Sequence, residues 1–333
     1  MKNVDLGSQG LKVSQMGLGC MGMSTYIYGP SDDEESLSTL QRAIELGVTF
    51  FDTAETYGMG HNEQLLGRAF AGIRDRVVIA TKVGFGFGDD GKIKVVDGKR
   101  VVDGRPANVV RAIEGSLRRL QMDYIDLVYL HRIDPTTPIE ETIGAMSKLV
   151  AEGRIGHIGL SEAAASTIRR AHAVHPITAV QTEYSLFERG VEANGVLDTV
   201  RELGIGFVPY SPLGRGFLTG QLKMDELHKT DFRNTDPRLN AANLKANLRI
   251  VEAIRQIAES RGVKPAQLAL AWTIAKGSIP IPGTRRLANL EENVASTGIV
   301  ITPDEVNMLD EAAPIGITSG ERYTEDGMSL VNR

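Results

Sequence analysis

Apolar and polar residues alternate along the chain in a rhythm typical of strands separated by helices. Short runs rich in Val, Ile, Leu or Phe are bounded by Gly, Pro or charged residues, as strands buried on both faces of a parallel sheet are. Such runs predict strands near residues 16–19, 48–51, 77–81, 125–130, 155–160, 178–181, 205–209 and 278–281.

The stretches between these runs carry helix signals. The stretch 31–35 offers a capping side chain and first-turn acidic residues that begin one helix, and Gly47 ends it. Residues 108–120 place apolar side chains on one stripe of a 3.6-residue period, and the segments 139–150 and 195–203 are followed closely by glycines. Strands and helices that alternate eight times predict a (β/α)8 or TIM barrel, a fold of the α/β class.

Three segments fall outside this alternation. Residues 2–14 resemble a β-hairpin that plugs the barrel floor. The stretch 84–105 is glycine-rich and charged, with a hairpin turn at Asp97-Gly98, and residues 211–243 form a long connection after the seventh strand. Long loops in a compact domain usually serve as lids or binding loops, so we expect both over the C-terminal face of the barrel. Residues 1–333 are expected to form this one domain.

Composition and charge exclude several classes of protein. The 333 residues carry a formal net charge of -5 and have an isoelectric point near 5.8, so they offer no basic surface to nucleic acid or anionic membrane. The N-terminus lacks the apolar core of a signal peptide, and no stretch reaches the length of a membrane span. Cys20 is the one cysteine, which excludes an internal disulfide. We expect a cytoplasmic protein without nucleic-acid or membrane partners.

One motif near the N-terminus imitates a dinucleotide-binding fingerprint. Residues 17–22 match G-x-G-x-x-G, a motif that requires a helix directly after it. The following segment, 23–30, contains Gly29-Pro30 and shows no helical stripe. We therefore reject a Rossmann-type site and assign these glycines to tight packing.

Four side chains able to do acid–base chemistry follow the ends of successive strands. Asp52, Lys82 and His131 end the second, third and fourth apolar runs, and Tyr57 follows Asp52 closely. The carboxyl ends of parallel barrel strands meet at one rim, where enzymes of this architecture place their active sites. We therefore expect these four side chains to converge.

The four residue types fit proton transfer to a carbonyl. A phenol is a weak acid at neutral pH, and an ammonium about 4 Å away would favour its phenolate by roughly 4 kcal/mol, or ~3 pKa units before desolvation is subtracted. Tyr57 would be the acid, Lys82 its polariser and Asp52 the anchor of Lys82. A neutral imidazole at His131 would orient the substrate oxygen.

Each of these residues has a simpler structural interpretation. Asp52 can cap a turn, Tyr57 can cover the barrel edge, and a single buried histidine is more often structural than catalytic. Lys82 can be solvated, or it can form a Schiff base as in barrel aldolases. Because all four lie at adjacent strand ends, we favour a shared catalytic role.

Several motifs resemble those of the aldo-keto reductases, over a stretch from Leu11 to about Asn293. The resemblance is closest to bacterial aldo-keto reductases and plant perakine reductase-like enzymes, and it implies an Asp-Tyr-Lys-His tetrad at the four residues above. It also implies an NADP-dependent oxidoreductase that reduces aldehydes and ketones to alcohols, without a metal site. The motifs are Gly47–Gly58, Asn62–Gly67, Thr81–Lys82, Tyr129–His131, Gly159–Ser161 and Tyr210–Gly216.

The same resemblance implies an NADPH site around the rim. Ser161 and Gln181 would bind the nicotinamide carboxamide, and Tyr210 would stack on the nicotinamide ring. Two adjacent arginines after the eighth strand favour NADPH over NADH, with Thr284 and Arg285 at the 2′-phosphate. The remaining expected contacts are Ser211, Leu213, Gly214 and Arg215 along the pyrophosphate, Gly283 beside the phosphate, and Asn289, Glu292 and Asn293 around the adenine.

One position departs from the family pattern, and some alternatives stay open. Glu162 stands where many relatives carry Asn, and we expect its carboxylate to turn away from the cofactor or to have a partner. The chain could instead be an NADPH-binding regulatory subunit like the potassium-channel β subunits, or a Schiff-base aldolase using Lys82. The expected partner is a small carbonyl substrate of unidentified structure, and either a monomer or a homo-oligomer is compatible with the sequence.

Overall fold

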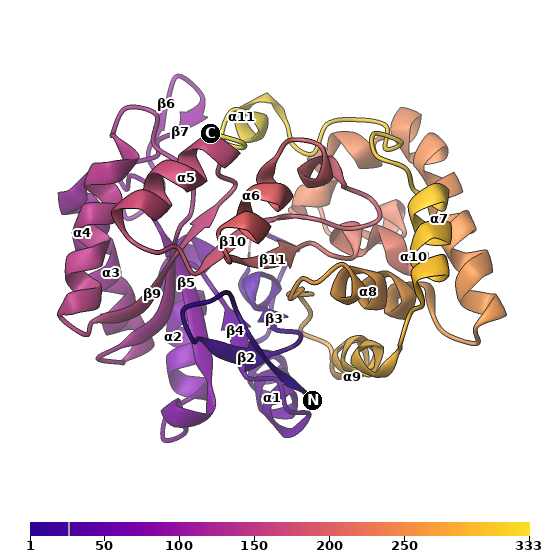
Figure 1. The fold of residues 1–333 in the computed structure, drawn as a ribbon, viewed down its shortest axis with the longest axis horizontal. Helices are drawn as coiled ribbons and strands as arrows, with labels where there is room; N and C mark the ends of the chain where they lie inside the picture. The colour runs from indigo at the N-terminus through magenta and orange to yellow at the C-terminus, as the bar shows by residue number, and fades with distance from the viewer. Residues whose placement is uncertain (26) are drawn as a thin grey trace.

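The computed structural model describes residues 1–25 and 27–333 and shows a nearly closed barrel of parallel strands (Figure 1). Neighbouring strands follow one another in chain order, and every pairing in this sheet is parallel. This confirms the predicted fold class. The strands are β3 (Leu18–Gly19), β4 (Phe50–Asp52), β5 (Val78–Val83), β8 (Ile125–Leu130), β9 (Ile155–Ser161), β10 (Ala179–Glu183) and β11 (Gly206–Tyr210).

The eighth apolar run closes the barrel without forming a regular strand. On one side, the amides of Gly17 and Gly19, at β3, donate to the carbonyls of Pro280 and Pro282. On the other side, the amides of Ile279 and Ile281 donate to carbonyls of β11. The two prolines lack an N–H group, so this segment cannot form a complete ladder on both sides. The predicted strand at 278–281 is therefore an extended connection that bridges β11 and β3.

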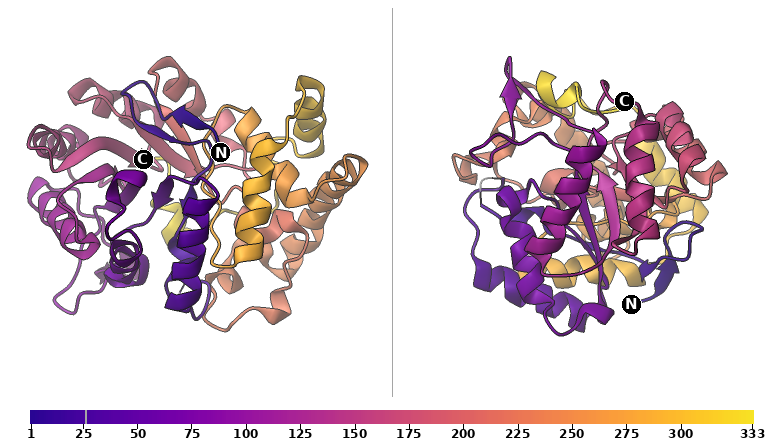
Figure 2. Two further views of the ribbon diagram at one scale, coloured as in Figure 1. Left: turned by 90° about the horizontal axis from the view of Figure 1, so that it is seen from below. Right: turned by 90° about the vertical axis from the view of Figure 1, so that its left-hand side faces the viewer.

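Helices form the outer layer around the strands, as the views from two further sides show (Figure 2). The first helix begins where expected, because the Asp32 carboxylate accepts hydrogen bonds from the amides of Glu34 and Glu35. The helices are α1 (Asp33–Glu45), α2 (His61–Ala69), α3 (Pro106–Leu120), α4 (Ile139–Ala151), α5 (Ala165–Val174), α6 (Val196–Glu202), α7 (Ala241–Ser260), α8 (Pro265–Ala275), α9 (Leu287–Ala295), α10 (Pro303–Ala312) and α11 (Glu325–Met328).

The N-terminal hairpin covers the amino-terminal end of the barrel, as predicted. Its strands β1 (Asn3–Asp5) and β2 (Lys12–Ser14) pair antiparallel. The amide of Ser8 donates to the carbonyl of Gly204, just before β11, and the fully buried Leu6 joins the apolar cluster inside the barrel. This plug leaves the carboxyl ends of the strands as the open face.

Both long loops lie at that open face and contain short ordered turns. In the first, β6 (Val95–Val96) and β7 (Lys99–Arg100) flank Asp97 and Gly98, whose φ angles of 51° and 74° suit the expected hairpin turn. The second is built from short 3-10 turns rather than from structureless chain. They span Gly214–Thr219, Met224–Glu226, Phe232–Thr235 and Pro237–Leu239.

The C-terminal segment also returns to the open face, which the sequence patterns did not indicate. After α10 it runs to α11, and the amide of Asn332 donates to the carbonyl of Glu162, directly after β9. Residues of this segment thereby reach the rim of the barrel. Among the described residues, no helix combines the length and apolarity that crossing a membrane requires.

Candidate active site

A cavity of about 930 Å³ opens at the carboxyl ends of the strands, and all four predicted catalytic residues line it. Asp52 ends β4, Lys82 lies in β5, His131 follows β8, and Tyr57 begins a turn after β4. Parallel pairing of β4 with β5 and of β5 with β8 holds their backbones in register. The predicted convergence of these four side chains is therefore observed in the structure.

Tyr57, Lys82 and Asp52 form a continuous chain of polar contacts. The Lys82 ammonium donates to the Tyr57 hydroxyl at 3.1 Å, to the Thr53 carbonyl at 3.0 Å and to the Asp52 carboxylate. Lys82 is only 1% exposed, so its charge is shielded from water and acts strongly on its neighbours. The second Asp52 oxygen accepts a hydrogen bond of 2.7 Å from the Gln181 amide nitrogen.

Burial and neighbouring charges determine the protonation of this group. Burial raises the pKa of Tyr57 above its ordinary value and outweighs the opposing effect of Lys82. The attraction of Lys82 lowers the pKa of Tyr57, as predicted, but desolvation has the larger effect. For Lys82, burial opposes the charged form, but Asp52 and Tyr57 raise its pKa above the ordinary value. Tyr57 is thus a phenol and Lys82 an ammonium at neutral pH.

His131 lies against two aromatic rings at the same rim. Its ring centroid is 6.1 Å from that of Tyr57 and 5.2 Å from that of Phe85, both in edge-on geometry. Burial and the charge of Arg132 hold its pKa well below the usual range, so the imidazole is neutral. The Nδ1 atom is buried and has no hydrogen-bond partner among the described residues.

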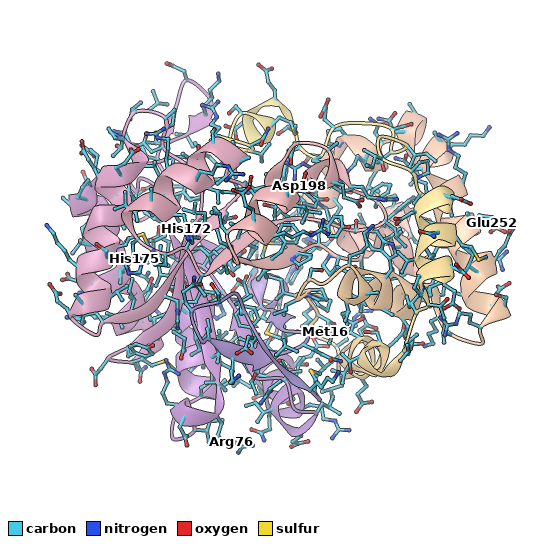
Figure 3. The ribbon with its side chains drawn as sticks, in the orientation of Figure 1. Met16, Arg76, His172, His175, Asp198 and Glu252 are labelled. Atoms are coloured by element: carbon cyan, nitrogen blue, oxygen red, sulfur yellow. The ribbon has the colours of Figure 1, made fainter. Side chains whose placement is uncertain are left out.

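Two other histidines lie away from this cavity. His172 and His175, at the end of α5, belong to the outer helical layer (Figure 3). Neither lines the cavity, whereas His131 does.

Nearly all residues expected at a cofactor line the same cavity. Gly214 is the exception and does not line the cavity. It packs against the Phe187 ring so closely that a Cβ atom at this position would lie 3.0 Å from the ring. Its φ angle of 56° makes it a turn residue that shapes the loop. The lining residues are Ser161, Gln181, Tyr210, Ser211, Leu213, Arg215, Gly283, Thr284, Arg285, Asn289, Glu292 and Asn293.

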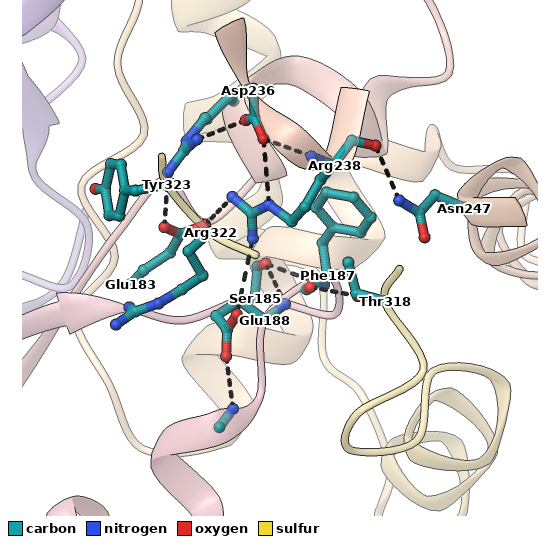
Figure 4. Close-up of polar contacts among 12 residues, drawn as sticks. Glu183, Ser185, Phe187, Glu188, Asp236, Arg238, Asn247, Thr318, Arg322 and Tyr323 are labelled. Carbon is teal, nitrogen blue, oxygen red and sulfur yellow. Dashed lines mark hydrogen bonds and ion pairs between the residues drawn. The ribbon is translucent and has the colours of Figure 1, made fainter. Parts of the chain in front are cut away.

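The Arg215 side chain is held in a buried cluster of charges below the loop 211–243. Its guanidinium pairs with Asp236 and, at 3.1 Å, with Glu183, the last residue of β10. Arg238 also pairs with Glu183, at 2.7 Å, and the close-up shows Glu183 and Asp236 on either side of Arg238 (Figure 4). These pairs connect the loop to a barrel strand.

We expect Glu183→Gln to destabilise the protein strongly at neutral pH. Burial opposes ionisation of Glu183, but Arg238 and Arg215 lower its pKa to about 2 from an ordinary value of 4.5. A lowered carboxyl pKa stabilises the fold above pH 4.5, and the contribution is lost as the pH falls towards 2. The shift corresponds to about 3 kcal/mol in the free energy of unfolding.

Denaturant unfolding between pH 7 and pH 2.5 measures this contribution. The difference between wild type and the Gln variant should shrink as the pH falls. A constant difference would mean that the ion pairs with Glu183 are not its source. Glu202→Gln is the matched control, since Glu202 pairs with Arg169 on the exposed surface, where water screens the pair, and its loss should change stability little.

Glu162 turns away from the cavity and has the partner that the sequence argument required. Its carboxylate is 2% exposed and accepts two hydrogen bonds from Arg322, at 3.0 and 2.9 Å. It also accepts a hydrogen bond of 2.7 Å from the Tyr210 hydroxyl, which lies 2.7 Å from the Tyr323 hydroxyl. Arg322 and Tyr323 come from the C-terminal segment, so that segment fixes the orientation of Tyr210.

Two further cavity residues, Arg132 and Tyr323, were missed by the sequence analysis. Arg132 directly follows His131, so its position after a strand end was a usable signal. Tyr323 lies far from every barrel strand in sequence and offered no such signal.

Comparisons with known proteins agree with this geometry. The family model described as "Aldo/keto reductase family" matches residues 15–314. The soybean (Glycine max) protein named "Probable aldo-keto reductase 1" is 43% identical over 326 residues, covering 96% of this chain and 91% of its own length.

Solved structures show the same similarity. Glycerol dehydrogenase AKR11B4 from Gluconobacter oxydans superposes with a TM-score of 0.83 at 28% identity, over 93% of this chain and 94% of its own. Aldo-keto reductase AKR11C1 from Bacillus halodurans, in a holo form, gives a TM-score of 0.78 at 28% identity, over 97% and 99% of the two chains. The chain therefore belongs to the aldo/keto reductase family, oxidoreductases that act on carbonyl compounds.

Proposed function

We propose that the protein reduces aldehydes and ketones to alcohols with NADPH, and that Tyr57 donates the proton. The observation that carries this proposal is the 3.1 Å contact between the Tyr57 hydroxyl and the Lys82 ammonium inside the cavity. A reduced nicotinamide supplies the hydride when it is bound. The residues of the chain then have to hold the carbonyl and deliver a proton to its oxygen.

The geometry supports distinct roles for three of the residues. Tyr57 is protonated at neutral pH because burial raises its pKa, so it starts in the form that can donate. As its proton moves to the substrate oxygen, the negative charge that develops on the phenol faces the Lys82 ammonium. Asp52 holds that ammonium in place, and Gln181 in turn holds Asp52.

His131 would orient the substrate. Its neutral imidazole can donate one hydrogen bond to a carbonyl oxygen without competing with Tyr57 as an acid. The edge-on contacts with Tyr57 and Phe85 restrict the direction of the ring.

The lining residues fit a nicotinamide at this end of the cavity. Tyr210 would stack on the ring, and its hydroxyl is anchored by Glu162. Ser161 and Gln181 would bind the carboxamide; Gln181 uses its amide nitrogen on Asp52, which leaves its amide oxygen for the ligand.

The same cavity extends to residues suited to the rest of NADPH. Ser211, Leu213 and the backbone of Arg215 would follow the pyrophosphate, beside the turn made by Gly214. Gly283, Thr284 and Arg285 precede α9 and would meet the 2′-phosphate, because helix starts and arginines bind anions well. Residues of α9 would surround the adenine, namely Asn289, Glu292 and Asn293.

Arg285→Ala should change the preference between cofactors. We expect KM for NADPH to rise about 10-fold to 100-fold, as loss of a charge-assisted contact predicts, with KM for NADH nearly unchanged. Steady-state kinetics with both cofactors measures the change. An equal rise for NADPH and NADH would contradict the assignment of Arg285 to the 2′-phosphate. Arg201→Ala is the control, because Arg201 is exposed at the end of α6 and does not line the cavity.

Oxidation of NADPH over many turnovers with an aromatic aldehyde tests the proposed activity. Tight NADPH binding without turnover on any carbonyl compound would instead favour the regulatory-subunit alternative. Trapping of a lysine adduct by borohydride would favour the aldolase alternative. The ion pair between Lys82 and Asp52 opposes the aldolase alternative. It keeps Lys82 protonated, whereas formation of a Schiff base requires a neutral amine.

A further inference from the structure

Arg132 occupies a position beside the proposed reaction centre that none of the roles above explains. It directly follows His131 and lines the cavity. Its Nη1 atom donates to the His131 carbonyl at 2.6 Å and to the Ser161 hydroxyl at 3.2 Å. Its Nε and Nη2 atoms make no hydrogen bond to the described residues. A guanidinium has five N–H groups, so most of its donors are still available to a ligand.

The charge of Arg132 also lacks a partner. Among the described residues, no carboxylate lies within ion-pair distance of it, although the group is mostly shielded from water. The charge of Glu162 acts on Arg132, but this carboxylate already pairs with Arg322. The Asp52 carboxylate, which lines the same cavity, pairs with Lys82. A partly buried cation without a counterion is costly, and a bound anion would remove that cost.

The phosphates of the proposed cofactor are poor candidates for this anion. Their expected contacts lie at residues 211–215 and 283–285, whereas Arg132 touches Ser161, which we place at the nicotinamide carboxamide. The charge of Arg132 acts on both Tyr57 and His131, lowering the pKa of each, so it lies near both groups that would meet the carbonyl. An anion at this point would therefore belong to the substrate.

Another cation, Arg100, also lines the cavity, but it pairs with Asp326 at 2.8 Å. The lining further includes apolar and aromatic side chains, namely Phe85, which contacts the His131 ring edge-on, Ile93 and Tyr28. A substrate with a ring or an alkyl chain would bury its body against these side chains. Its carbonyl would face Tyr57, and an anionic group would face Arg132.

We infer that Arg132 determines substrate specificity by binding the carboxylate of the substrate, so that the enzyme prefers aldehydes and ketones that carry a carboxylate. This inference rests on the proposed carbonyl reduction. It does not follow from that activity, since a reductase with the same four residues can act on neutral carbonyl compounds. Guanidinium and carboxylate form two parallel hydrogen bonds, which adds orientation to attraction.

Positional isomers of carboxybenzaldehyde, each compared with its neutral methyl ester, test the inference. The 2-, 3- and 4-isomers sample different separations between aldehyde and carboxylate. We expect the wild-type enzyme to show kcat/KM at least ~10-fold higher for one acid than for its ester. Similar values for all acids and their esters, with the esters reduced normally, would overturn the inference and leave the proposed activity intact. No reduction of any aldehyde would instead contradict the proposed activity.

The variants Arg132→Met and Arg132→Lys separate substrate binding from effects on the chemistry. The Met variant should lose ~10-fold to 100-fold in kcat/KM for the preferred acid, chiefly through KM, and change little on the ester. The Lys variant keeps the charge but lacks the planar guanidinium that forms two parallel hydrogen bonds, so it should recover part of the loss in kcat/KM. Equal losses on acid and ester would mean that Arg132 acts on Tyr57 or His131 rather than on the substrate carboxylate, and would overturn the inference.

A matched control and a folding measurement complete the test. Arg76 is exposed before β5, at the end of that strand opposite Lys82, and is labelled at the edge of the molecule in Figure 3. Arg76→Met should leave the preference for acids unchanged. Thermal unfolding should show that Arg132→Met is folded. Its Kd for NADPH should change far less than its KM for the preferred acid, because among the described residues Arg132 meets the expected cofactor site through the Ser161 hydroxyl alone.

Discussion

Tyr57→Phe is expected to lower the rate of carbonyl reduction by about 100-fold or more, the usual contribution of a positioned acid. The substitution removes one hydroxyl group, which receives a hydrogen bond of 3.1 Å from Lys82, and keeps the ring against His131. The cavity wall is preserved, so the Kd for NADPH should change little. Steady-state reduction of an aromatic aldehyde and fluorescence titration of NADPH measure the two quantities.

Tyr184→Phe serves as the matched control. Tyr184 is buried, donates to Glu192 and does not line the cavity. Loss of the Tyr184 hydroxyl should reduce the stability of the protein without changing the reduction rate per folded molecule. Turnover in Tyr57→Phe comparable to wild type would exclude Tyr57 as the proton donor.

Lys82→Met is expected to reduce both activity and stability. Without the ammonium, the Asp52 carboxylate stays buried with Gln181 as its main donor, and breaking a buried ion pair in this way typically costs about 3–5 kcal/mol. The negative charge that develops on Tyr57 would also lose its partner, so we expect activity to fall by about 100-fold or more. Denaturant unfolding and steady-state kinetics measure the two effects.

The double variant Lys82→Met with Asp52→Asn distinguishes the two effects. It removes both charges, and neutral replacements of a buried pair often restore stability. We therefore expect its free energy of unfolding to recover towards the wild-type value while its activity stays low. Recovery of activity together with stability would show that Lys82 acts on the fold alone.

Much of the fold could be predicted from local patterns. Buried strands of a parallel sheet are apolar runs, so seven of the eight predicted strands appear within a few residues of their expected positions. The eighth run, around Ile279 and Ile281, has the right composition, but Pro280 lies within it and Pro282 directly follows it, and these two prolines replace a regular strand by an extended bridge. The hairpin at Asp97-Gly98 was recognisable because this dipeptide accepts positive φ angles.

The electrostatics of the site could not be derived in the same way. The sequence suggested that Lys82 assists proton release by Tyr57, but the extent of burial sets the net direction, and it raises the pKa of Tyr57. The partner of Glu162 was equally hidden, because Arg322 lies 160 positions away along the chain. Such contacts depend on which distant segments meet.

Local patterns were enough to predict the barrel and the residues at its strand ends, because strand, helix and turn signals are local and parallel strands bring their carboxyl ends to one rim. The surroundings of those residues became known from the three-dimensional packing. It placed the C-terminal segment against Tyr210, committed the Arg215 side chain to Glu183, and left Arg132 without a carboxylate partner among the described residues. The physical reason is that burial and charge pairing depend on every segment that packs at the rim, and no local pattern records that packing.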